Sequence, residues 1–169
     1  SEEEIRKAIT LIPESEKKDL PLLERALAAS LYKQAEGLRS QGKTQEAAGA
    51  FLKVYNTVPG TDIAPVALYD AGVLYEQVKE WDKAIETYEI LYQKYPGSQY
   101  AFNAAVQWAE ILERDNEYIK AAGVYEKAAG LAADKSLKEE ASYKALTMYE
   151  KSGNLNELYN NYYKSYERF

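Results

Sequence analysis

The chain has 169 residues, and its 21 lysines and arginines against 27 aspartates and glutamates give a formal net charge of −6. This balance disfavours nucleic acid as a partner, because that affinity depends mainly on cations that neutralise phosphates. The sequence has no histidine and no cysteine, which excludes disulfides, thiolate nucleophiles, imidazole bases and metal sites built on either residue. Hydrophobic residues make up 46%, and no apolar run is long enough to cross a bilayer. We expect a folded globular chain that is unusually rich in tyrosine, with 16.

The N-terminal stretch, residues 1–27, is predicted to hold a short helix and a loop. Ile5, Ile9 and Ile12 share one face of a helix, which Pro13 interrupts. We interpret this stretch as a partial repeat or a cap. The first residue is serine rather than methionine, and no signal peptide precedes it, so we expect a piece of a longer chain.

Beyond this stretch, apolar residues recur every three or four positions, which predicts helices and no strand. Turns rich in glycine, proline or asparagine separate these helices. The predicted N-caps are Thr44, Thr61 or Asp62, and Ser98. The expected helices cover residues 21–40, 44–57, 63–78, 81–95, 99–114, 117–132, 136–151 and 154–167.

The chain repeats itself with a constant period of 37 residues. Small residues dominate two columns of equivalent positions, which hold Ala35, Gly72, Ala109 and Leu146, and Ala47, Ala84, Ala121 and Leu158. Large side chains fill two others, which hold Leu38, Tyr75, Leu112 and Tyr149, and Phe51, Tyr88, Tyr125 and Tyr162. Each repeat is therefore predicted to be two helices that approach closely at the small residues, with a ring in the next gap.

The second repeat carries the most specific pattern. Leu68, Gly72 and Tyr75 are followed by Ala84 and Tyr88, and Pro96 comes next. This pattern resembles the tetratricopeptide repeat (TPR), whose signature is W-x2-L-G-x2-Y, A-x3-F and P. The resemblance covers about residues 28–169. It weakens in the fourth repeat, where leucine replaces both the glycine and the alanine and no proline follows.

The resemblance implies an all-α, right-handed superhelical solenoid of antiparallel helix pairs. Four TPR-like units are expected at 28–64, 65–101, 102–138 and 139–169, in a single domain. The resemblance also implies a concave groove, lined mainly by the first helix of each unit, that binds peptides or proteins. The period of 37 and the Tyr95-Pro96-Gly97-Ser98 ending resemble the variety found in bacterial cell-envelope proteins such as the Tol-Pal coordinator and the lipoprotein of the outer-membrane assembly machine. This implies a periplasmic or envelope location, with a cytoplasmic one as the alternative.

In the TPR register, three tyrosines of the first helices fall in one column, at Tyr32, Tyr69 and Tyr143. Such rings suit contact with an extended peptide, and the alternative is that they pack on the neighbouring repeat. The candidate partner-binding residues are Tyr32, Glu36, Arg39, Tyr69, Val73, Glu76, Asn103, Glu110, Glu113, Tyr143 and Glu150. The same face also holds Ala29, Val66, Val106, Glu140 and Thr147. An acidic, aromatic groove favours basic or apolar segments, unless these charges are ordinary solvated helix surface.

The last expected helix has an aromatic face. Its rings are spaced i, i+3, i+4, i+7 and i+10, and the candidate oligomer or next-repeat face is Tyr159, Tyr163, Tyr166 and Phe169. Further chain could cover this face, a second copy could bind it, or it could pack within the fourth repeat.

The sequence favours a non-catalytic scaffold that binds a protein or peptide, with no cofactor, no metal, no nucleic-acid partner and no membrane span. Carboxylate neighbours such as Glu139 and Glu140 have no nucleophile or proton acceptor beside them. One alternative is a structural module that oligomerises through the tyrosine-rich end. Another is a glycan-binding surface on stacked tyrosine and tryptophan rings.

Overall fold

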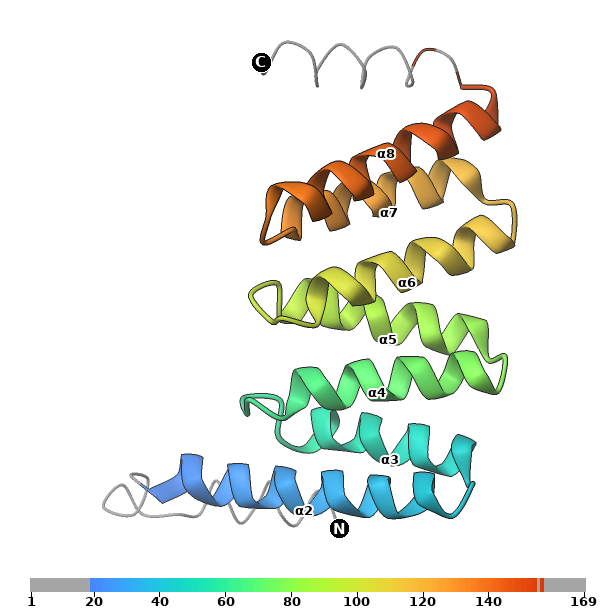
Figure 1. Ribbon diagram of the computed structural model, residues 1–169. Coiled ribbons are helices and arrows are strands. Elements are labelled where there is room, and N and C mark those ends of the chain that lie inside the picture. The colour runs from blue at the N-terminus through green and yellow to red at the C-terminus, as the bar shows by residue number, and fades with distance from the viewer. Residues whose placement is uncertain (1–18, 155, 157–169) are drawn as a thin grey trace. The chain divides into compact units, whose positions relative to one another are not determined.

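The computed structural model describes residues 19–154 and 156, and most of these residues are helical (Figure 1). No strand occurs in this part of the chain. Its helices are α2 (Leu20–Ser40), α3 (Thr44–Thr57), α4 (Ala64–Gln77), α5 (Trp81–Lys94), α6 (Ala101–Arg114), α7 (Tyr118–Leu131) and α8 (Lys135–Ser152). The expected helices from 21–40 to 136–151 are confirmed, with ends that differ by at most two residues. The helix expected at 154–167 and the short one near the start lie outside the described residues.

The chain divides into two compact units, one that ends at Glu80 and one that begins at Trp81. In the first unit, α2 packs on α3 and α3 packs on α4. In the second unit, α5 packs on α6, α6 on α7 and α7 on α8. Short turns join these helices, so neighbours within each unit run antiparallel (Figure 1). The boundary between the units falls inside the second repeat, between its two helices.

The repeated columns form the core of both units. Phe51, Tyr88 and Tyr125, one from each of the first three repeats, are fully buried. The small residues that precede them, at Ala47, Ala84 and Ala121, are fully buried as well. Because a ring and a small residue are buried at the same places in successive repeats, the predicted packing pattern is confirmed for the described residues.

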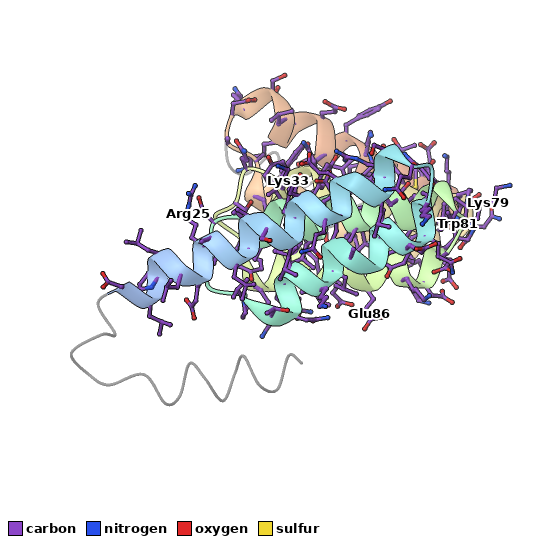
Figure 2. The ribbon with its side chains drawn as sticks, turned by 90° about the horizontal axis from the view of Figure 1, so that it is seen from below. Arg25, Lys33, Lys79, Trp81 and Glu86 are labelled. Atoms are coloured by element: carbon purple, nitrogen blue, oxygen red, sulfur yellow. The ribbon has the colours of Figure 1, made fainter. Side chains whose placement is uncertain are left out.

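A left-handed turn closes each first helix, and these turns repeat with the same period. Positive φ angles occur at Gly42 (75°), Lys79 (60°), Asn116 (61°) and Gly153 (72°), each 37 residues after the one before. Glycine and asparagine adopt this conformation readily, whereas a lysine there is unusual. Lys79 lies in the turn that ends α4, at the close of the first unit (Figure 2). The period of 37 residues is thus a property of the backbone from Gly42 to Gly153.

The predicted N-caps were wrong by one or two positions. Lys43 and Ile63 occupy the cap positions of α3 and α4, without a side-chain hydrogen bond. The backbone at Ile63 is already helical, and a preceding turn satisfies the amide of Ala64, which donates to the Thr61 carbonyl at 3.2 Å. A capping side chain is therefore not needed there.

Ser98 was predicted as the N-cap of α6, but it lies two residues before the actual cap position. The cap position of α6 is Tyr100, whose amide donates to the Ser98 hydroxyl at 3.2 Å. A true side-chain cap occurs at Asp134, whose Oδ1 accepts a hydrogen bond from the Leu137 amide at 2.9 Å. Asp134 has an extended backbone, which is the usual geometry of an N-cap.

Candidate functional site

The first helices of repeats one and two, α2 and α4, are joined through Asp70. The Tyr32 hydroxyl donates a hydrogen bond to Oδ2 of this carboxylate, and the Arg39 guanidinium lies 3.6 Å from Oδ1. The Asp70 side chain is only 19% exposed, so solvent screens these contacts less than it screens a surface pair. Phe51 of α3 completes the cluster, because the Tyr32 ring meets it edge-on at 4.9 Å and Arg39 lies 5.4 Å from its centroid.

A second link joins α2 to the turn that precedes α4. The Arg25 guanidinium donates to both oxygens of Asp62, with Nε 3.1 Å from Oδ1 and Nη2 3.2 Å from Oδ2. Figure 2 shows Arg25 on the outside of the helix. Both side chains are more than 60% exposed, so this pair contributes little to stability.

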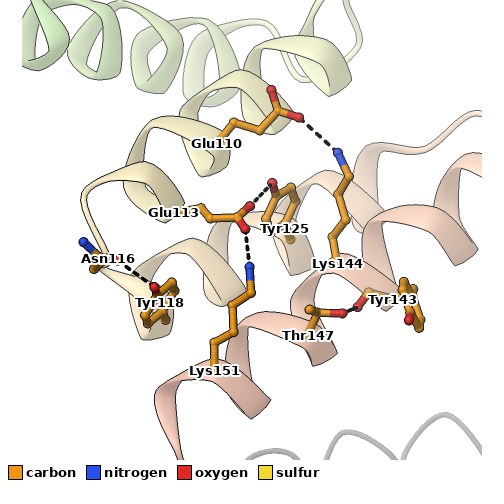
Figure 3. A network of polar contacts seen from close by, with 9 residues as sticks. All are labelled: Glu110, Glu113, Asn116, Tyr118, Tyr125, Tyr143, Lys144, Thr147 and Lys151. Atoms are coloured by element: carbon orange, nitrogen blue, oxygen red, sulfur yellow. Dashed lines mark hydrogen bonds and ion pairs between the residues drawn. The ribbon is translucent and has the colours of Figure 1, made fainter.

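The first helices of repeats three and four, α6 and α8, are joined by two lysines of α8 (Figure 3). The ammonium group of Lys144 lies 3.0 Å from Glu110, and that of Lys151 lies 2.6 Å from Glu113. The buried Tyr125 of α7 also donates its hydroxyl proton to Glu113, at 3.4 Å. The hydrogen bond to Glu113 raises the pKa of Lys151 above its ordinary value. Glu110 and Glu113 of α6 are therefore each paired with a lysine of α8.

The candidate partner-binding residues lie on the first helices as predicted, but in different environments. Glu36, Arg39, Asn103, Glu110, Tyr143 and Glu150 are exposed, and Tyr32, Tyr69, Val73, Glu76 and Glu113 are half-buried. The three tyrosines of the expected ladder are not equivalent, because Tyr32 is tied to Asp70 whereas the Tyr143 side chain is 71% exposed. The candidate oligomer face at Tyr159, Tyr163, Tyr166 and Phe169 lies outside the described residues.

Two residues central to these contacts, Asp70 and Lys144, were missed by sequence reasoning. They occupy equivalent positions two repeats apart, and both contact the first helix of the preceding repeat. The signal in the sequence was a pair of opposite charges separated by a little less than one repeat. Arg39 precedes Asp70 by 31 residues, and Glu110 precedes Lys144 by 34. Such pairs can meet only when successive first helices lie side by side.

Tyr32 and Tyr125 make the stability of the protein sensitive to alkaline pH. Burial, followed by the hydrogen bond to Asp70, raises the pKa of Tyr32 above its ordinary value. Burial, followed by the charges of Glu110 and Glu113, raises the pKa of Tyr125. The stabilisation is complete below about pH 10, where the unfolded tyrosine is still protonated, and is lost as the pH rises towards the folded-state pKa.

We therefore expect the free energy of unfolding to fall above about pH 10. The double variant Tyr32→Phe/Tyr125→Phe should be less stable than the wild type at neutral pH, because it lacks both hydroxyl hydrogen bonds. Its disadvantage should shrink at high pH, as the wild type loses the tyrosine contribution. Urea unfolding near pH 8 and near pH 11 measures this difference, and an unchanged difference would show that neither hydroxyl resists ionisation.

The two tryptophans are both covered by cations of the protein. The guanidinium of Arg114 lies 3.2 Å from the centroid of Trp81, and the ammonium of Lys127 lies 4.7 Å from that of Trp108. Trp108 is only 7% exposed. Trp108 is therefore buried, and one face of the half-buried Trp81 ring is occupied by a guanidinium.

Within residues 19–154, no three acidic side chains converge in a way that could hold a metal ion. None of the helices in the range combines the length and the apolar character that a membrane span requires. Several polar contacts in this range join one helix to another, among them those of Asp70, Lys144 and Lys151.

The comparisons with known proteins agree with this arrangement. Residues 29–61 and 66–98 match the tetratricopeptide repeat family, and the two matches begin 37 residues apart. A crystal structure described as nearly identical TPR-like repeats of a kinesin light chain, from Podospora anserina, is similar in fold with a TM-score of 0.52. It is 12% identical in sequence, and the alignment covers 81% of this chain and 72% of that one. No curated protein matches the sequence.

Residues 29–61 and 66–98 are therefore two tetratricopeptide repeats, and the described part of the chain has an all-α fold of the TPR type. The matched segments correspond to the first two of the four expected repeats. The left-handed turns at Asn116 and Gly153 extend the same period beyond them.

Proposed function

We propose that the chain is a non-catalytic module that binds a protein or peptide segment through the first helices of its repeats. The observation that carries this proposal is the pair of tetratricopeptide repeats at 29–61 and 66–98, because such repeats generally mediate protein–protein interaction. Exposed Arg39 of α2 and exposed Tyr143 of α8 support it, since arginine and aromatic residues are enriched at protein interfaces.

The test is a surface footprint of the protein with and without a partner captured from its native host. We expect the partner to protect exposed first-helix residues, such as Ala29, Asn103 and Tyr143. Exposed residues of the second helices, such as Glu86 and Lys120, serve as the matched set and should react equally in both states. Protection confined to the second helices would contradict the proposal, as would the failure of any protein to bind.

We also propose a location in the bacterial cell envelope. This proposal rests on the period of 37 residues and on the Tyr95-Pro96-Gly97-Ser98 ending of the second repeat. A signal peptide and an acylated cysteine in the full-length sequence would support it. A full-length sequence without an export signal would contradict it.

A further inference from the structure

We propose that one face of α8 binds an arginine- or lysine-rich segment of the partner. This face, the α8 stripe, consists of Glu140, Tyr143, Thr147 and Glu150, which follow one another at helical spacings of three and four residues. The inference rests on the proposed function, and it adds where the partner binds and what chemistry it offers.

The ring at the centre of the α8 stripe is available for contact. The Tyr143 side chain is 71% exposed, whereas the equivalent Tyr32 donates its hydroxyl proton to Asp70 and packs edge-on against Phe51. Val106, the equivalent residue of repeat three, packs on the core cluster of the second unit. Among these three equivalent positions, only Tyr143 is placed to meet a partner with most of its ring.

The lysines next to the α8 stripe are turned away from it. Lys144 and Lys151 both point to α6, where they pair with Glu110 and Glu113, while the Tyr143 ring lies on another side of α8 (Figure 3). Neither carboxylate of the stripe has an ion-pair partner within residues 19–154. Among the described residues, the stripe thus presents an exposed ring between two carboxylates that have no ion-pair partner.

This combination fits a guanidinium or ammonium group better than an apolar side chain. A cation can lie over a tyrosine ring and pair with a neighbouring carboxylate at the same time. An apolar segment would instead remove Glu140 and Glu150 from water without compensation. The protein already uses the same chemistry internally, where Arg114 lies over Trp81 and pairs with Asp115 at 3.4 Å.

The test is a titration of the 169-residue protein with a synthetic arginine-rich peptide and with its citrulline analogue, which has the same shape without the charge. We expect the arginine peptide to bind at low salt, and the citrulline peptide to bind at least about tenfold more weakly. Tyr143→Ala and the double variant Glu140→Gln/Glu150→Gln should each weaken binding about tenfold. All changes are at exposed or half-buried surface positions, and circular dichroism confirms folding.

The control is Asp82→Asn/Glu86→Gln, which removes the same charge from exposed positions of α5. We expect its affinity to stay within about twofold of the wild type, since distant surface charges are screened. If this control loses as much peptide affinity as the α8 variants, the binding is only the general attraction of a basic peptide to an acidic protein, and the inference is overturned. So would tight binding of the citrulline peptide, full affinity of Tyr143→Ala, or no binding of the arginine peptide. If any of these occurs while the native partner still protects first-helix residues, the proposed function stands and only the α8 stripe is wrong.

Discussion

Replacing Phe51 with alanine is expected to lower the free energy of unfolding by about 3–5 kcal/mol. The ring is fully buried in the first unit, where it contacts Tyr32 and lies beneath Arg39. Its removal leaves a cavity and also removes the surface against which both α2 side chains are held next to Asp70. Urea unfolding followed by circular dichroism measures the change.

The control for this prediction is Phe51→Leu, which keeps most of the buried apolar surface. We expect it to cost about 1–2 kcal/mol, clearly less than alanine. A cost below about 1 kcal/mol for Phe51→Ala would contradict the packing described here.

Enlarging the small residue at Ala35 is expected to have the second largest effect. Ala35 is fully buried on the side of α2 that packs within the first unit. A leucine there adds volume to a filled space, so we expect Ala35→Leu to lower the free energy of unfolding by about 1–3 kcal/mol. The matched control is Ala29→Leu, on the same helix at an exposed position, which should change stability by less than about 0.5 kcal/mol. Equal effects of the two variants would show that α2 does not need a small residue at position 35.

Most of the fold could be predicted from the sequence because each structural requirement recurs every 37 residues. One repeat alone is ambiguous, but Phe51, Tyr88 and Tyr125 support one another as a buried column. The left-handed turn at Lys79 could not be predicted in this way, because lysine is not a residue that signals a positive φ. The prediction of the N-cap of α4 was wrong because a backbone turn before this helix satisfies an amide that a side chain would otherwise cap.

For the candidate site, the sequence predicts which face of each helix a residue occupies, but not which contacts its side chain makes. Periodicity places Tyr32 and Tyr143 in equivalent positions, yet one is held by Asp70 and the other is exposed. The difference depends on which long side chains reach across to the neighbouring helix, and a helical pattern contains no information on that choice. Lys144 and Lys151 illustrate this, since either could have faced solvent and both instead contact α6.

The most direct test of a partner-binding surface on the first helices compares two residues in one footprint. Tyr143 and Ile119 are both large and exposed, by 71% and 53%. Tyr143 lies on α8, which is a first helix, and Ile119 lies on α7, which is a second helix; both helices belong to the compact unit that begins at Trp81. When the native partner is bound, we expect the modification of Tyr143 to fall sharply and that of Ile119 to stay unchanged. Protection of Ile119 with continued modification of Tyr143 would contradict the account.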